Sequence, residues 1–436
     1  MTMVDNSIPK GIRYLLLDAF FVKGALTILD QCCVSGTNFL TGVIIARTCG
    51  KEQFGLYVLG FSMFLFFSIS LQQSLIISPY TIFGPRLKGK EHFVYMGSTL
   101  IHQIGLSLLA VVTLALISGV ILARIGLPQL EPVGWSLCGT IPLILLKEYA
   151  RRICFAELKI HLALFMDVSV AIIQIGTLML LAQYNLLSPS RSFVVIGAAC
   201  GFASLAWLIR NRKSIILEKR QIALHLYHNC MFGKWVFGTS LAELMGAELY
   251  PWCLTMFYGT TATGVLAVCI GVVSLISPFV VGVQNLLGPK MARAFTETGT
   301  LEIRKMAINT TIFLAVIVGV FCVIMITMGD RIVLLIYGEK YAGNGSVVSV
   351  LALSVYVLTI TIPEDYGIWA MERPDLNFKI NFIVLLIAVS FGLFLAKSLG
   401  PLGAAFGLLI ARITAATFRS IVFTKLFRVS ELGNKQ

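Results

Sequence analysis

Charged residues are scarce in this chain: Asp, Glu, Lys and Arg supply 13% of its 436 residues, against about a quarter in soluble globular domains. Hydrophobic residues supply 57%. A composition this poor in charge excludes a soluble protein, and it leaves no polar stretch long enough for an extramembrane domain of useful size. Nearly all of the chain is therefore expected to lie within a membrane.

Cysteine pairs of the CxxC type, and histidine clusters beside the cysteines, are also missing. The ten cysteines run from Cys32 to Cys322 without a CxxC pair, and no histidine cluster lies beside them. Disulfide frameworks and structural metal sites both need such spacing, so we interpret the cysteines as small core residues. No metal ion or cofactor is predicted.

The first apolar segment lacks the features of a cleavable signal peptide. Asp18 and Lys23 interrupt it, and no small-residue cleavage site follows. Residues 11–23 are instead expected to form a short interfacial helix, and the first span would then act as the insertion signal.

Long apolar runs are what the sequence has in abundance. About 20 apolar residues in a helix cross roughly 30 Å of hydrocarbon, so these runs predict an all-α polytopic membrane protein. Twelve transmembrane windows are predicted: 25–46, 55–79, 98–123, 133–149, 162–184, 192–209, 235–258, 264–287, 307–328, 346–370, 378–396 and 401–424.

The lysines and arginines indicate how these spans are oriented, because basic turns stay on the cytoplasmic side. With a cytoplasmic N-terminus, 26 of the 34 lie on the N-terminal side, seven lie on the other side, and Arg412 lies within a span. The net charge of +13 is then an orientation signal, and no nucleic-acid partner is predicted. We expect a multi-pass protein of the cytoplasmic membrane with both termini cytoplasmic.

Three short matches indicate that the chain consists of two similar halves. They occur in the same order, at spacings of 209, 204 and 206 residues. The pairs are Phe54-Gly55-Leu56 with Thr263-Gly264-Val265, Gly84-Pro85-Arg86 with Gly288-Pro289-Lys290, and Gly197-Ala198-Ala199-Cys200-Gly201 with Gly403-Ala404-Ala405-Phe406-Gly407. A fourth match, Ile77-Ser78-Pro79-Tyr80 with Ile276-Ser277-Pro278-Phe279, has a spacing of 199 residues, and we treat it as a coincidence.

Six spans in each half predict two pseudo-symmetric lobes related by an axis along the membrane normal, with a cavity between them. This is the geometry of an alternating-access transporter. The predicted division is 1–24 (N-terminal segment), 25–210 (N-lobe), 211–234 (basic cytoplasmic linker), 235–424 (C-lobe) and 425–436 (cytoplasmic tail).

The first turn on the outer side, ARTCGKEQFGLYVLG, carries a recognisable pattern: Arg47, Gly50, Glu52 and Phe54-Gly55-Leu56-Tyr57. It resembles the polysaccharide-transport family, which contains the O-antigen and teichoic-acid flippases. Lys51 stands where that family usually has Pro. Two further stretches are similar to the same family: Leu335-Ile336-Tyr337-Gly338 with Tyr341, and Leu399-Gly400-Pro401-Leu402-Gly403-Ala404-Ala405.

The resemblance implies a flippase of the multidrug/oligosaccharidyl-lipid/polysaccharide (MOP) superfamily. It would move a polyprenyl-pyrophosphate-linked oligosaccharide across the cytoplasmic membrane by alternating access, for cell-surface polysaccharide biosynthesis. Its partners would be that substrate, membrane lipids, and the polysaccharide polymerase and chain-length machinery. The alternative is a MATE-type cation-coupled multidrug exporter, which shares the two-lobe plan. An enzyme is not predicted, because no outside loop is large enough for a catalytic domain.

Polar residues of the first span are candidate substrate contacts. Thr27, Gln31, Ser35, Asn38 and Gly42 fall within roughly 80° of one another around the helix. Such a stripe either lines a polar cavity or packs against a neighbouring helix. We expect it to line the cavity, and Arg47 at the end of the span is a further candidate contact.

Arg412 is the clearest basic residue within a span, where a guanidinium is costly unless it meets a partner or a ligand. Arg419 shares its helix face, and the two could hold a pyrophosphate. Alternatively, Arg412 pairs with a buried acid and Arg419 is an anchor at the cytoplasmic side. Both alternatives stay open for Arg412, and the anchor is favoured for Arg419.

Four acids are expected within spans: Asp30, Asp167, Glu243 and Glu248. A buried carboxylate can carry a coupling proton, and Glu243 and Asp30 are the candidates. Glu243 and Glu248 project about 140° apart, so only one can face the centre of the cavity, and we expect Glu243.

A basic cluster closes the fourth span: Lys147, Glu148, Arg151 and Arg152. It favours a positive-inside anchor over a site for an anionic lipid headgroup.

Overall fold

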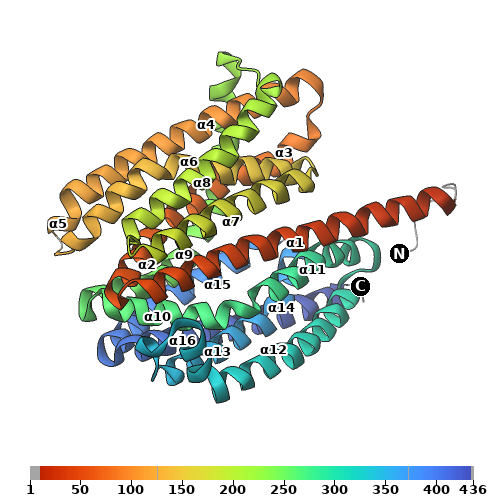
Figure 1. The fold of residues 1–436 in the computed structure, drawn as a ribbon. Helices are drawn as coiled ribbons and strands as arrows, with labels where there is room; N and C mark the ends of the chain where they lie inside the picture. Colours follow the sequence, from red (N-terminus) through yellow and green to blue (C-terminus); the bar gives the residue numbers. More distant parts are fainter. Residues whose placement is uncertain (1–9, 125, 372, 434–436) are drawn as a thin grey trace.

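The computed structural model describes residues 10–124, 126–371 and 373–433, and this part of the chain is almost entirely helical (Figure 1). Each of the twelve predicted windows coincides with helix. The elements, with η for 3-10 or π segments, are α1 Lys10–Thr48, α2 Lys51–Leu65, η1 Phe66–Ile77, α3 Ser78–Phe83, η2 Gly84–Arg86, α4 Gly89–Leu116, η3 Ile117–Ile121, α5 Leu122–Arg124, η4 Pro128–Leu130, α6 Glu131–Ala156, α7 Ile160–Gln183, α8 Pro189–Asn211, η5 Arg212–Ser214, α9 Lys219–Tyr258, α10 Thr260–Val273, η6 Ser274–Ile276, α11 Ser277–Thr298, α12 Thr300–Tyr337, η7 Glu339–Tyr341, α13 Gly345–Ile360, α14 Ile362–Ala370, α15 Pro374–Ile387, η8 Ala388–Gly392 and α16 Leu393–Gly433.

Nine stretches of the described residues are long and apolar enough to cross a membrane. One of them, Asp375–Phe427, covers two of the predicted windows. The chain turns between those windows at Gly400, whose φ of 60° and ψ of −136° interrupt α16. Only glycine adopts such a conformation readily, so Gly400 separates the last two spans.

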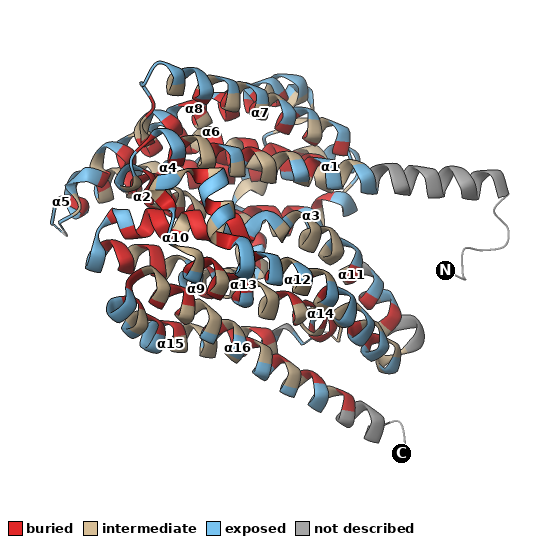
Figure 2. Ribbon diagram, turned by 60° about the horizontal axis from the view of Figure 1, so that its bottom comes forward, coloured by how far each residue is buried: buried red, intermediate tan, exposed pale blue. Residues whose placement is uncertain are grey.

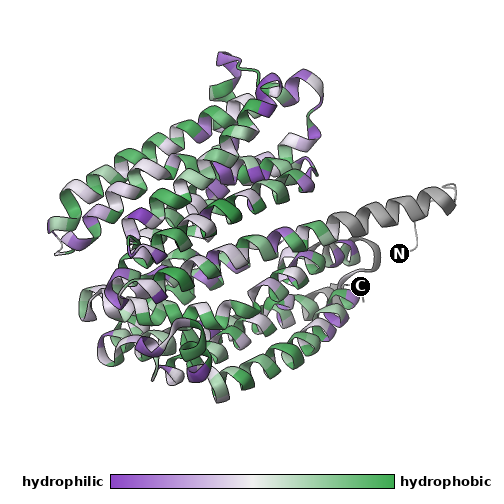
Figure 3. Cartoon of the chain, in the orientation of Figure 1, coloured by the Kyte–Doolittle hydropathy of each residue, from purple (hydrophilic) through white to green (hydrophobic). Residues whose placement is uncertain are grey.

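The outer faces of the helices are apolar. Leu108, Ile172 and Val316 are 61%, 69% and 62% exposed, and Figure 2 shows the buried residues where helices face one another. Figure 3 shows hydrophobic residues along the lengths of the helices and hydrophilic ones gathered near their ends and turns. Exposed apolar area on this scale needs lipid to cover it, so the chain is a multi-pass membrane protein.

The helices form two lobes, α1 to α8 (the N-lobe) and α9 to α16 (the C-lobe), as Figure 1 shows. The lobes join where α2 and α10 begin. A Cβ atom on Gly55 would collide with the carbonyl oxygen of Thr260, and one on Gly264 with the carbonyl oxygen of Lys51. Gly55 and Gly264 are the paired glycines of the first repeat match, so the repeated positions of the two lobes contact each other.

The fourth match falls within continuous helical stretches of the two lobes. Pro79 lies within Lys51–Arg86 and Pro278 within Thr260–Phe295, each beside a change of helix type, η1 or η6. A proline inside a helix removes one backbone hydrogen bond, so each is a place where its span can bend.

Two predicted segments belong to longer helices. The expected interfacial helix at 11–23 is continuous with the first span, because α1 begins at Lys10. Much of the expected linker is the first half of α9, which contacts α4: His102 Nε2 lies 2.9 Å from the Ile222 carbonyl oxygen, and Tyr95 donates to Asn229 Oδ1 at 2.9 Å. The 40-residue α9 therefore contacts both lobes.

Candidate functional site

A cavity of about 480 Å³ lies between the lobes. Both lobes supply its walls, as predicted for a two-lobe transporter. Its lining is Asn38, Phe39 and Gly42 of α1, Phe54, Tyr57, Val58, Phe61 and Leu65 of α2, Ala247, Glu248 and Pro251 of α9, Leu266, Ala267, Ile270, Gly271 and Val273 of α10, Ser274, Tyr337 of α12, Leu351, Ser354, Val355 and Leu358 of α13, and Leu408 and Arg412 of α16. We call it the central cavity.

Its walls are mostly apolar and aromatic, with few polar groups. Phe39, Tyr57, Phe61 and Tyr337 supply aromatic rings, and Tyr57 and Phe61 stack with their ring centroids 6.2 Å apart. Binding sites for organic ligands commonly combine such walls with a few polar groups that fix orientation. The polar groups therefore decide what this cavity can bind.

The charged residues that line the central cavity are Glu248 and Arg412. The hydroxyl of Ser62 in α2 accepts a hydrogen bond of 3.1 Å from the Trp252 indole of α9. Arg412 is half-buried and, within the described part of the chain, forms no hydrogen bond or ion pair. The N–H donors of Arg412 are therefore available to a ligand in this cavity.

Arg412 also lines a second cavity, of about 330 Å³, which lies within the C-lobe. Arg419 shares that lining and is only 8% exposed. Its guanidinium lies 3.3 Å from Asp365 Oδ1 and donates to Asn381 Oδ1 at 3.2 Å. The structure therefore reverses the alternative drawn from the sequence: Arg419 pairs with an acid, the half-buried Asp365, whereas Arg412 faces the two cavities.

The two glutamates of α9 face different cavities, as their spacing predicts. Glu248 lines the central cavity, so the expectation that Glu243 faces its centre is wrong. Glu243 lines the C-lobe cavity and accepts a hydrogen bond of 2.7 Å from Asn381 Nδ2. The spacing fixes the angle of about 140° between the two glutamate side chains around the helix. It does not say which of the two faces the central cavity.

The polar stripe of α1 divides between two environments. Asn38 and Gly42 line the central cavity. Gln31 Nε2 donates to Ser35 Oγ at 3.2 Å along the same helix, and neither residue is part of the lining of the two cavities described above.

Arg47 lies apart from both cavity linings, on the exposed surface where the lobes join. It donates from Nε to the Ile336 carbonyl oxygen at 2.7 Å and from Nη2 to that of Leu335 at 2.5 Å. Its bonds therefore join α1 of the N-lobe to the end of α12 in the C-lobe.

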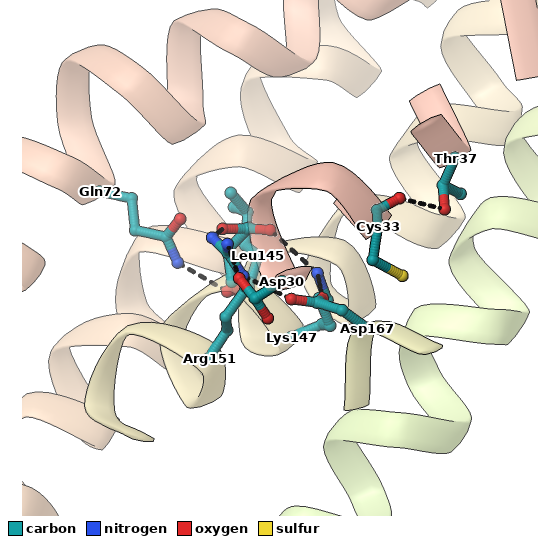
Figure 4. A network of polar contacts seen from close by, with 9 residues as sticks. Asp30, Cys33, Thr37, Gln72, Leu145, Lys147, Arg151 and Asp167 are labelled. Atoms are coloured by element: carbon teal, nitrogen blue, oxygen red, sulfur yellow. Dashed lines mark hydrogen bonds and ion pairs between the residues drawn. The ribbon is translucent and has the colours of Figure 1, made fainter. Parts of the chain in front are cut away.

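Asp30 is fully buried within the N-lobe in a network of ion pairs, shown in Figure 4. Arg151 Nη2 lies 2.5 Å from Asp30 Oδ2, and Arg151 Nε lies 2.6 Å from Asp167 Oδ2. Lys147 pairs with the other oxygen of Asp167. The charges of the two acids and the two bases thus compensate one another in the interior, and their ion pairs connect α1 to α6 and α6 to α7.

The cluster at the end of the fourth span therefore divides. Lys147 and Arg151 point into the N-lobe and belong to the network, which corrects their interpretation as surface anchors. Arg152 is exposed. Glu148 is 22% exposed and lies 3.2 Å from Lys147 Nζ, so it is the network's fifth and outermost charge.

The cysteines are free thiols, and seven of them are buried: Cys49, Cys138, Cys154, Cys200, Cys253, Cys269 and Cys322. Among the described residues, no group of three or more His, Cys, Asp or Glu side chains lies close enough together to hold a metal ion.

No protein-family model matches the sequence. Among curated proteins, the chain is similar to the capsular polysaccharide biosynthesis protein CapF of Staphylococcus aureus, with 21% identity over 175 residues. The match covers 40% of this chain and 44% of that protein, so it spans less than half the length of this curated relative.

Solved structures are similar over nearly the whole chain. An inward-facing multidrug resistance MATE family transporter of the MOP superfamily has a TM-score of 0.73 at 13% identity, with 92% of this chain and 96% of that chain covered. Lipid II flippase MurJ, in an inward closed conformation, has a TM-score of 0.71 at 16% identity, with 94% and 87% covered.

A MOP superfamily transporter from Pyrococcus furiosus, described as having a binding pocket of reverse polarity, has a TM-score of 0.69 at 12% identity, with 95% and 96% covered. Likeness at such identities concerns the fold alone. These neighbours are transporters and not enzymes. The chain therefore has the fold of a MOP superfamily transporter.

Proposed function

We propose that the chain is a flippase that moves a polyprenyl-pyrophosphate-linked oligosaccharide across the cytoplasmic membrane by alternating access between its two lobes. The observation that carries this proposal is the unpaired guanidinium of Arg412 on the wall shared by both cavities. Among the described residues, the basic side chains that are buried, Lys147, Arg151 and Arg419, all have acidic partners.

A guanidinium at this depth is costly unless an anion meets it, and it binds phosphate oxygens through two parallel hydrogen bonds. The aromatic walls offer flat faces against which sugar rings pack, while the prenyl chain stays in lipid. The similarity to a capsular polysaccharide biosynthesis protein and the resemblance of the turns at Arg47 and Tyr337 point to the same class of substrate.

Energy coupling in this proposal runs through ion or proton entry at Glu243 or Asp30. Glu243 lines the C-lobe cavity, so an ion can reach it. Asp30 lies in a balanced network, so a proton taken up there would leave Arg151 with one acidic partner fewer.

The test is transport in liposomes. Purified protein is reconstituted with a fluorescent oligosaccharide on a polyprenyl pyrophosphate, and an outside quencher follows its transfer. Arg412→Ala should slow transfer about 10- to 100-fold, the factor that corresponds to lost charge-assisted hydrogen bonds. Arg412→Lys keeps the charge without the paired geometry and should fall in between.

A MATE-type exporter is the second candidate, because Glu248 lies in the same cavity as Arg412 and MATE transporters share the fold. Efflux of a cationic dye driven by a pH gradient separates the two. Dye efflux without lipid transfer, or lipid transfer that is unchanged in Arg412→Ala, would overturn the flippase proposal.

A further inference from the structure

Two helices from different lobes end next to each other where the lobes join. Arg47, in the last turn of α1, donates to the carbonyl oxygens of Leu335 and Ile336 in the last turn of α12. In return, Lys340 of η7 donates from Nζ to the carbonyl oxygens of Arg47 at 2.8 Å and Cys49 at 2.6 Å. Each lobe therefore supplies the cation that satisfies the end of the other lobe's helix.

Helix chemistry explains why these contacts form. The last carbonyl groups of a helix have no partner within it, and they carry the negative end of the helix dipole, which attracts cations. Here the cation comes across the boundary between lobes in both directions. The two turns involved are two of the three that stand out in the sequence, ARTCGKEQFGLY and LIYGEKY.

We propose that Arg47 and Lys340 form a reciprocal clasp that holds the lobes together at the end opposite the chain termini, and that this clasp breaks whenever the central cavity opens at that end. Its four hydrogen bonds cross the lobe boundary, so a separation of about 1 Å there stretches each beyond hydrogen-bonding distance. The proposal rests on alternating access in the proposed function, but not on the identity of the substrate.

The exposure of the clasp suits a contact that must open in every cycle. Arg47 is exposed and Lys340 is half-exposed, and charged contacts at a surface are individually weak. Beneath the clasp, Gly55 and Gly264 allow α2 and α10 to pack backbone to backbone. The clasp thus adds a reversible polar contact to a closely packed apolar one.

Cys49 is a natural reporter of this clasp. It is 4% exposed, and its carbonyl oxygen is one of the acceptors of Lys340. Burial raises the pKa of the Cys49 thiol, and the Lys340 ammonium lowers it. Because the thiolate is the reactive form, loss of Lys340 with no movement would slow the reaction of Cys49. Faster reaction after that change therefore reports opening.

The experiment measures how fast a membrane-impermeant maleimide modifies Cys49 in the purified full chain, with peptide mass spectrometry to assign the site. Arg47→Ala and Lys340→Ala should each speed modification of Cys49 about fivefold, the factor that corresponds to roughly one lost hydrogen bond. Arg331→Ala, which removes an exposed arginine from the same helix α12, is the matched control and should leave the rate unchanged.

Cys269 is fully buried in the C-lobe and reports general loosening. The variant that combines Arg47→Ala with Lys340→Ala tests the clasp most severely. If maleimide modifies its Cys49 no faster than in the wild type, the clasp proposal is overturned. A parallel rise in the rate at Cys269 would overturn it too. If the flipping assay fails while Cys49 reacts faster and Cys269 does not, the substrate proposal fails and the clasp stands.

Discussion

The buried charges of the N-lobe act as a set. Asp30, Lys147, Arg151 and Asp167 contain two charges of each sign, and all four side chains are at most 7% exposed. Removing one member of such a set leaves a buried charge without compensation, which costs about 3–5 kcal/mol, whereas neutral replacement of a whole pair is often tolerated. Single changes in the network should therefore be more harmful than paired ones.

This reasoning gives a stability prediction. Asp30→Ala should lower the free energy of unfolding by about 3–5 kcal/mol, whereas Glu148→Ala, at the network's exposed edge, should cost less. Unfolding in detergent, followed by circular dichroism, compares the two. Equal losses would contradict the network. An Asp30→Asn variant that keeps its stability but loses the pH dependence of transport would mark Asp30 as a coupling acid instead.

Single-residue roles could be predicted only where they depend on local sequence. The apolar windows around Arg412 and Asp30 revealed that both lie within spans. The windows carried no information about which residues these side chains contact. Asp30 and Asp167, for example, both pair with Arg151, yet they lie 137 residues apart in the sequence. For the same reason, Lys147 and Arg151 looked like surface anchors, and Arg419 rather than Arg412 turned out to be the paired arginine.

At the scale of elements, the contact between α2 and α10 depends on the absence of two side chains. Gly55 and Gly264 each face a carbonyl oxygen of the opposite helix, Thr260 and Lys51 respectively. Because those oxygens belong to the backbone, a methyl group at either glycine can be accommodated only if the helices move apart. Overpacking of this kind costs about 1–3 kcal/mol.

Gly55→Ala and Gly264→Ala should therefore favour the state in which the lobes are separated at this end, and Cys49 should react with maleimide more quickly in both. Gly36→Ala is the control, since a Cβ atom there would meet nothing within 4 Å. This variant should leave the rate unchanged and should stabilise α1 slightly, because alanine has a better helix propensity than glycine. Wild-type reactivity in both Gly55→Ala and Gly264→Ala would rule out this role for the contact.

Helix existence was predictable and helix extent was not. A run of about 20 apolar residues is a local property, so every predicted window contains helix. By contrast, α9 extends 16 residues before its window, from Lys219 to Lys234, because packing against α4 supports a segment that is too polar to be a span.

At the scale of the whole molecule, the proposed alternating access requires the lobes to separate at the clasp. The Arg47 side chain donates to the backbone carbonyl oxygen of Leu335, so the two residues are neighbours across the lobe boundary. Cysteines introduced by Arg47→Cys and Leu335→Cys can be joined by a short bifunctional thiosulfonate reagent. The link should reduce transport at least about tenfold, as expected when one of two states becomes inaccessible, and a reducing agent should restore it. Full transport by the linked protein would contradict alternating access at this end. Each single-cysteine variant treated with the reagent is the control.

The global architecture followed from composition and repeats, because two lobes of six spans are a consequence of apolar length and internal similarity. The substrate did not follow in the same way. It depends on the chemistry of a cavity assembled from seven helices, and the lining carries one acid and one base. The choice of an anionic ligand rests on Arg412, which forms no hydrogen bond or ion pair with the described residues.

The long helix α9 adds a mechanical property. Ile222 and Asn229 tie its first half to the N-lobe, and Glu243 ties its second half to the C-lobe through Asn381. A single helix fixed to both lobes limits how they can move relative to each other, because the lobes cannot part beside α9 without bending it or breaking its contacts with one of them.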